Sequence, residues 1–252
     1  MAKGTVSGRD TEDALGNIAV GGGAGSGSSF TGVGNALIGC SAGDAVTTGK
    51  CNVAMGTNAL GASTTGCLNI AIGELAMGAA VTTGINNIAM GKAAMDALTS
   101  GFGNIALGTT ALGASTTGCY NIAIGIQALG ETDTTGINNY AIGTGAMDAL
   151  TSGACNIAIG ENALGASTTG SRNIAIGEIA IGSGDTTGTN NTAIGRGAIR
   201  DLTTGLCNVA LGDYALYATT TGCLNIAIGQ QAMAVGVVTG VNNIAIGTTA
   251  AD

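Results

Sequence analysis

The sequence contains no histidine, proline or tryptophan, and only 2% of its 252 residues are aromatic. Without histidine, the chain cannot form a Ser-His-Asp or Cys-His nucleophilic site, and it lacks the commonest metal ligand. Aromatic side chains fill much of an ordinary core, so a core made here of alanine, isoleucine and leucine should be narrow. We therefore expect no enzyme, and no catalytic, cofactor-binding or metal-binding residues.

Charge and long apolar runs are also scarce. Charged residues make up 9% of the chain, and the net charge of −8 comes from 15 acidic and 7 basic residues without a block of either sign. Nucleic acids attract basic stripes, and a membrane-spanning helix needs about 20 apolar residues in a row. The start, MAKGTVSGRDTED, is polar and unlike a signal peptide. The sequence predicts no nucleic-acid binding and no membrane insertion.

The sequence has instead a repeat that runs from one end to the other. The motif NIAIG and its close variants recur with steps of 18, 17 and 17 residues, so three coils make a 52-residue super-repeat. The asparagines that open the motif are Asn17, Asn35, Asn52, Asn69, Asn87, Asn104, Asn121, Asn139, Asn156, Asn173, Asn191, Asn208, Asn225 and Asn243. We predict an irregular or degenerate coil over 1–16 and a single repeat domain over 17–252.

The alternation in Ile-Ala-Ile has the period of a β-strand, and glycine ends each run. A unit of 17–18 residues cannot bury its own apolar face and must stack on copies of itself. The sequence therefore predicts an all-β fold, a parallel β-solenoid of about 14 coils with in-register ladders of Asn, Ile and Ala. In this interpretation the isoleucines stack to form the core, the asparagine amides bond along the axis, and the central alanines face the other way.

Small apolar columns let another backbone approach closely, so the outward alanines predict an interface between chains. The candidate residues are Ala54, Ala71, Ala89, Ala106, Ala123, Ala141, Ala158, Ala175, Ala193, Ala210, Ala227 and Ala245. The alternative is that these alanines pack against another strand of the same coil. In the first case we expect a homo-oligomer with cyclic symmetry.

The repeat Asn-x-Ala-Ile-Gly-x-x-Ala-Leu resembles two groups of fibrous proteins. These are the YadA-like head repeats of trimeric autotransporter adhesins and the NTAIGYxAL repeats, with TTG between them, of phage tail fibres. The matching residues in one coil are Asn69, Ala71, Ile72, Gly73, Ala76 and Met77. The resemblance implies a left-handed β-roll, a parallel homotrimer, and a role in adhesion or receptor binding. The present coil is longer than the adhesin-head repeat, and we find no stalk, membrane anchor or chaperone domain.

From these observations we expect a structural fibre module, of a viral tail or surface fibre, that serves as a rigid spacer and adhesive or receptor-binding scaffold. Its location would be the virion, the cell surface or the extracellular space, and its partner a host-surface receptor or glycan. Three alternatives stay open: a bacterial surface adhesin head, an extracellular filament assembled end to end, and an ice-binding protein with threonine ladders.

Two groups of polar residues allow two interpretations each. The seven cysteines are either small buried residues or disulfides, within or between chains. Asp44, Asp96 and Asp148 recur at 52-residue intervals and form either a solvated acidic row or part of a weak calcium site.

Overall fold

The computed structural model describes residues 15–27, 30–236 and 238–251, so nearly all of the predicted irregular segment 1–16 lies outside the described residues. The described chain is all β, with fourteen strands of three residues each and no helix, hence none that could cross a membrane. The strands are β1 (Ile18–Val20), β2 (Ala36–Ile38), β3 (Val53–Met55), β4 (Ile70–Ile72), β5 (Ile88–Met90), β6 (Ile105–Leu107), β7 (Ile122–Ile124), β8 (Tyr140–Ile142), β9 (Ile157–Ile159), β10 (Ile174–Ile176), β11 (Thr192–Ile194), β12 (Val209–Leu211), β13 (Ile226–Ile228) and β14 (Ile244–Ile246).

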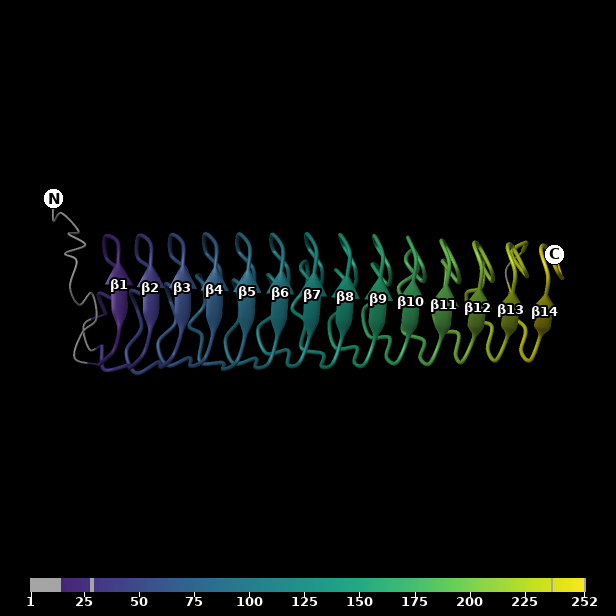
Figure 1. The fold of residues 1–252 in the computed structure, drawn as a ribbon. Helices are drawn as coiled ribbons and strands as arrows, with labels where there is room; N and C mark the ends of the chain where they lie inside the picture. Colours follow the sequence, from purple (N-terminus) through teal and green to yellow (C-terminus); the bar gives the residue numbers. More distant parts are fainter. Residues whose placement is uncertain (1–14, 28–29, 237, 252) are drawn as a thin grey trace. The chain divides into compact units, whose positions relative to one another are not determined.

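The chain divides into two compact units, Met1–Tyr120 with β1–β6 and Asn121–Asp252 with β7–β14. Within each unit every strand pairs in parallel with the next one along the chain, as Figure 1 shows. The pairing is in register, since Ala71 lies opposite Ala89, and Ala175 opposite Ala193. The predicted parallel β-solenoid is confirmed. The same coil occurs in both units. That residues 17–252 form one repeat domain nevertheless stays a prediction, because the chain divides into these two units.

The marker asparagines bond one coil to the next. The backbone N–H of Asn87 donates to Asn69 Oδ1 at 2.9 Å, and its side-chain Nδ2 donates to the same oxygen at 3.2 Å. Asn87 Nδ2 also donates to the carbonyl oxygen of Gly101 at 2.9 Å, near the end of its own coil. The same pattern recurs in the other unit, for example at Asn139. Each buried amide therefore closes its own coil and ties it to its neighbour.

The inside of the coil is the reverse of the prediction. The central alanines of the strands from Ala54 to Ala227 are fully buried, whereas the isoleucines on either side of them are half-buried or exposed. The interior is filled by these alanines, by a second alanine five residues later, and by the Leu, Met or Ile that follows it, such as Met77. The prediction that isoleucine forms the core and alanine faces outward is wrong.

The reason lies in the turn after each strand. Ala76 and Met77 are adjacent in sequence and both fully buried, which the alternation of an extended strand does not allow. Leu75 and Met77 have φ of 59° and 48°, so left-handed residues turn the chain and send the large side chain inward. Met77 and its equivalents then fill the interior beside the strand. The strand residue that points inward has room for a methyl group only, which is why it is alanine.

One coil exchanges the two volumes and supports this account. Leu37 replaces the strand alanine in β2, and Gly43 stands where most coils have Leu, Met or Ile. A Cβ added to Gly43 would lie 2.7 Å from Leu37 Cδ2, so the two positions share one interior space. A large residue on the strand is accommodated only where the turn supplies none.

A column of Ser and Thr hydroxyls is also buried, and its members differ in their partners. Thr186 Oγ1 donates to the carbonyl oxygen of Leu202 at 2.9 Å, whereas Thr219 Oγ1 has no hydrogen-bond partner among the described residues. A buried hydroxyl without a partner costs stability, and an isosteric apolar group does not. We expect Thr219→Val to raise the free energy of unfolding by about 1 kcal/mol and Thr186→Val to lower it by about 1–2 kcal/mol. Urea denaturation of the two variants checks this, and equal shifts would contradict it.

Candidate functional site

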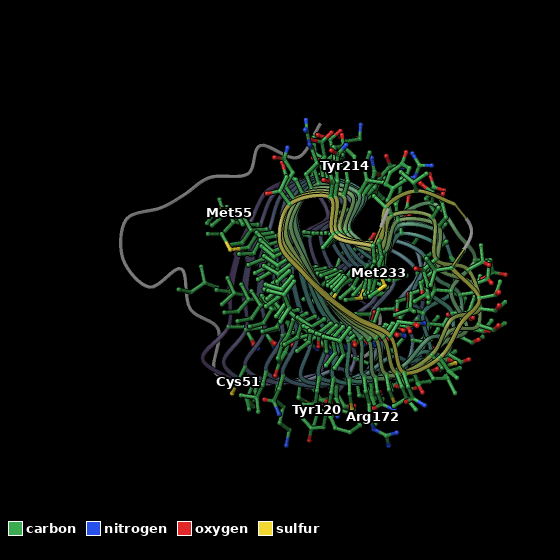
Figure 2. The ribbon with its side chains drawn as sticks, turned by 90° about the vertical axis from the view of Figure 1, so that its right-hand side faces the viewer. Cys51, Met55, Tyr120, Arg172, Tyr214 and Met233 are labelled. Atoms are coloured by element: carbon green, nitrogen blue, oxygen red, sulfur yellow. The ribbon has the colours of Figure 1, made fainter. Side chains whose placement is uncertain are left out.

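The first and third residues of each strand form a surface that we call the outer strand face. Its third-position side chains include Met55, Met90, Ile142, Ile159 and Ile194, each 38–43% exposed. In the Met1–Tyr120 unit, Met55 points outward, and in the Asn121–Asp252 unit Met233 points into the interior (Figure 2). Each side chain of the outer strand face therefore contacts the equivalent side chains of the neighbouring strands, and its end is exposed to solvent.

Charge is absent from the outer strand face. The described residues include sixteen charged side chains, and fourteen of them lie between five and twelve residues after a marker asparagine. The other two, Lys50 and Arg172, lie just before a marker. The outer strand face of each unit is thus a charge-free row, made of Ile, Val, Leu and Met apart from Ala36, Tyr140 and Thr192. A regular apolar row of this kind marks an interaction surface rather than a solvated one.

The predicted interface alanines lie elsewhere. Ala54, Ala71, Ala89, Ala106, Ala123, Ala141, Ala158, Ala175, Ala193, Ala210 and Ala227 have no exposed surface, and Ala245 is 4% exposed. They pack inside their own coil, as the alternative interpretation held, although each coil has one strand and not the second strand that this interpretation supposed. Buried in this way, they cannot contact another chain. The Leu37 and Gly43 exchange is the sequence signal that could have revealed this, because it pairs the strand position with an interior position of the turn.

The cysteines are neither buried nor paired. All seven lie in the described part of the chain and are free thiols; Cys40, Cys51, Cys155 and Cys207 are exposed, and Cys67, Cys119 and Cys223 are half-buried. Six of them precede a marker asparagine by one or two residues, on the outside of the coil. Cys67 Sγ accepts a hydrogen bond from the backbone N–H of Lys50 at 3.3 Å. The interpretation as buried small residues is wrong, and no disulfide forms within the chain.

The acidic residues form small groups only. Burial raises the pKa of Asp148, and the negative charge of Glu131 on the preceding coil raises it further. Asp185 Oδ1 accepts a hydrogen bond from Thr168 Oγ1 at 2.6 Å, and Asp96 Oδ1 accepts one from the backbone N–H of Ala79. Within the described ranges, no three acidic or cysteine side chains gather as a metal site would require, so the calcium interpretation gains no support.

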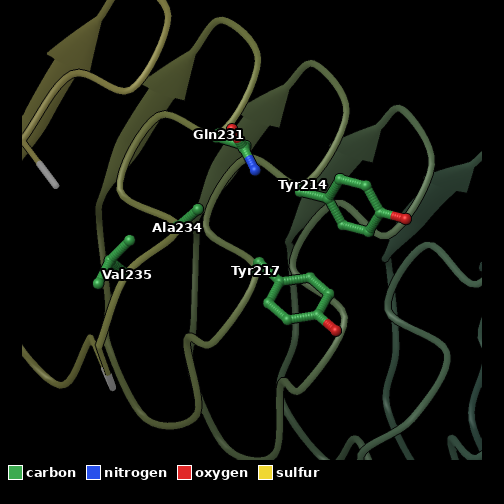
Figure 3. Close-up of a pocket in the computed structure, with 5 residues that line it drawn as sticks. All are labelled: Tyr214, Tyr217, Gln231, Ala234 and Val235. Atoms are coloured by element: carbon green, nitrogen blue, oxygen red, sulfur yellow. The ribbon is translucent and has the colours of Figure 1, made fainter.

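Two tyrosines in one coil form a cluster that the sequence analysis did not single out. The rings of Tyr214 and Tyr217 are 5.2 Å apart, edge to face, with an interplanar angle of 76°. The guanidinium carbon of Arg196 lies 4.9 Å from the Tyr214 centroid, and that of Arg200 lies 3.9 Å from the Tyr217 centroid. On the other side is a pocket of about 310 Å³, which Figure 3 shows between two successive coils. The sequence signal for this cluster was two tyrosines three residues apart in a chain with very few aromatic residues.

No family model matches the chain, and no curated protein is significantly similar to it.

Proposed function

We propose that this chain is a structural fibre module, of a viral tail or surface fibre, in which several copies associate side by side through their outer strand faces. The module serves as a rigid spacer and adhesive scaffold, without catalytic activity, on a virion or cell surface. The observation that carries the proposal is the outer strand face itself: it is repeated on every strand, is aliphatic apart from Tyr140 and Thr192, and has no charged residue among the described ones.

The size of the surface suits an interface. A strand of three residues is about 10 Å long and lies about 4.8 Å from the next, so each strand adds roughly 50 Å² of sheet face. The six strands of the Met1–Tyr120 unit thus offer roughly 300 Å² and the eight strands of the Asn121–Asp252 unit roughly 400 Å². Each is a sizeable part of the ~800 Å² that a partner contributes to a standard interface. Left in water, this much regular aliphatic surface would favour unspecific association, so a specific partner is expected to cover it.

A second copy of the chain is the partner that fits best. The surface lacks the charges that would steer a charged ligand or polymer to it. Its side chains recur at the spacing of the strands, and another copy of the chain has the same spacing. The side-chain rows of one chain can therefore pack between those of the other. The resemblance to trimeric fibre proteins favours three parallel copies with a left-handed β-roll in each.

The experiment measures the mass of the native protein in solution by light scattering, with the chain mass of 23.9 kDa as the unit. We expect three times that mass for the wild type, and a mass of one chain for a variant with Ile142→Lys, Ile159→Lys and Ile194→Lys. A buried lysine without a partner is costly, and three in one interface should prevent association.

The matched control carries the same added charge in the turn that follows the strand, outside the outer strand face, with Thr144→Lys, Gln230→Lys and Thr248→Lys. These positions lie five residues after a marker, where other coils already have Lys92 and Arg196. The control should keep the mass of the wild type, and circular dichroism should show both variants folded. A wild type of one chain mass, or an isoleucine variant that still associates, would reject the proposal.

A further inference from the structure

The pocket beside Tyr214 and Tyr217 results from a local break in the repeat. Nine residues after the marker, the earlier coils of the same unit carry glycine, aspartate or arginine, such as Gly130, Asp148 and Arg200, whereas Tyr217 stands there in coil 208–224. The next coil has Ala234 at that position. A large ring is thus followed by a methyl group one layer further on, and the difference in size leaves the hollow of about 310 Å³.

The two rings are held from the preceding coil. Arg200 stacks on Tyr217 and donates to both carboxylate oxygens of Asp201, at 2.7 and 3.0 Å. Arg196 stacks on Tyr214, and its guanidinium lies 3.8 Å from Asp213 Oδ2. Each cation is therefore paired with an acid and lends its flat face to a ring. Fixed rings form a preorganised wall, which reduces the entropy lost when a ligand binds.

The pocket itself is uncharged. Its lining is Tyr214, Tyr217, Gln231, Ala234 and Val235, and Figure 3 shows the tyrosines on one coil and the other three on the next. Neither tyrosine hydroxyl, nor the side-chain amide of Gln231, forms a hydrogen bond with another residue in the described part of the chain. Two hydroxyls and one amide thus offer donors and acceptors beside an apolar floor.

From these features we infer that the pocket between coils 208–224 and 225–242 binds one unit of a neutral saccharide. A pyranose ring has a face of C–H bonds that packs on the negative face of an aromatic ring, and a rim of hydroxyls that needs both donors and acceptors. The volume lies at the lower end of the range for small-molecule sites, which suits a single ring. An anionic ligand fits less well, because both arginines are already paired and neither lines the pocket.

This inference rests on the proposed adhesive role and gives it a ligand class. The test is saturation-transfer NMR on the full chain with millimolar methyl glycosides of glucose, galactose, mannose, N-acetylglucosamine and N-acetylgalactosamine, and with a sialoside as the charged comparison. We expect at least one neutral glycoside to receive saturation and the sialoside to receive none. No signal from any neutral glycoside, or a signal from the sialoside alone, would overturn the inference.

Variants then locate the binding. Tyr217→Ala should weaken the affinity at least tenfold, and Ala234→Tyr should do the same by filling the pocket with the side chain that the preceding coil already accepts. Tyr120→Ala is the control, since Tyr120 forms a similar edge-to-face pair with Phe102, 5.0 Å away, in the other unit. Equal affinities of Ala234→Tyr and the wild type would place the saccharide elsewhere and reject the site.

The same samples separate this inference from the proposed assembly. Their mass by light scattering reports association, and their saturation transfer reports the pocket. A monomer that binds a glycoside would reject the assembly alone, and an oligomer without binding would reject the pocket alone.

Discussion

Gly73→Ala is expected to lower the free energy of unfolding by about 4 kcal/mol, or to prevent folding of the coils around it. Gly73 has a φ of +133°, which L-residues rarely adopt, so alanine is strained there even without a neighbour. The added Cβ would also lie 2.5 Å from the carbonyl oxygen of Gly91. That backbone cannot retreat freely, because the Gly91 N–H donates to the Ile72 carbonyl oxygen at 2.8 Å.

The control is Gly22→Ala, where an added Cβ meets no atom within 4 Å and the φ lies outside the left-handed region. Guanidinium denaturation should show a midpoint close to that of the wild type for Gly22→Ala and a much lower one for Gly73→Ala. Two equal midpoints would mean that the close approach of coils at this glycine does not limit stability.

The second large effect is expected for Asn173→Leu, a change that nearly conserves volume. Asn173 is fully buried, its Nδ2 donates to the Gly188 carbonyl oxygen at 2.9 Å, and its Oδ1 accepts from the backbone N–H of Asn191 at 2.9 Å. Its Oδ1 also accepts from Asn191 Nδ2 at 3.1 Å. Leucine would leave the Gly188 carbonyl and the backbone N–H of Asn191 without these partners, at about 1–3 kcal/mol each, whereas Asn191 Nδ2 keeps its bond to the Gly205 carbonyl oxygen at 2.9 Å. We therefore expect a loss of about 4 kcal/mol.

Asn162→Leu is the matched control for this prediction. Asn162 is exposed, has a φ of 52°, and lies six residues after its marker, where another coil has Leu75 with a φ of 59°. Denaturation midpoints and amide hydrogen exchange should show little change for Asn162→Leu and weakened protection at 173 and 191 for Asn173→Leu. Similar behaviour of the two variants would show that the amide ladder is not what binds the coils together.

These two predictions concern features that the sequence indicated in advance. The steps of 17 and 18 residues gave the coil, the period of two gave the strands, and identical motifs gave the in-register stack. The asparagines are hydrogen-bonded from coil to coil within each unit, as amides at equivalent positions should be. All of these depend on the repeat itself and need no knowledge of which side chains point inward.

The pocket could be predicted from the sequence only in part. Tyr217 and Ala234 are 17 residues apart, so the register places them side by side once the coils are aligned. The arginines on the rings and the volume of the hollow depend on rotamers and turn geometry, which the repeat does not define. The position was available from the sequence, whereas its character as a binding site was not.

The sequence by itself determined the length of the coil, the parallel order of the strands and the file of asparagines, because each follows from copies stacked at one spacing. Only the tertiary structure decided which face of each strand is inside. The alternation in a run such as Ile70–Ile72 shows that isoleucine and alanine point to opposite faces, but it does not show which face is inside. The residues with positive φ in the turn direct Met77 into the interior, where its side chain leaves room for no strand residue larger than Ala71. The isoleucines of the strand therefore lie on the outside.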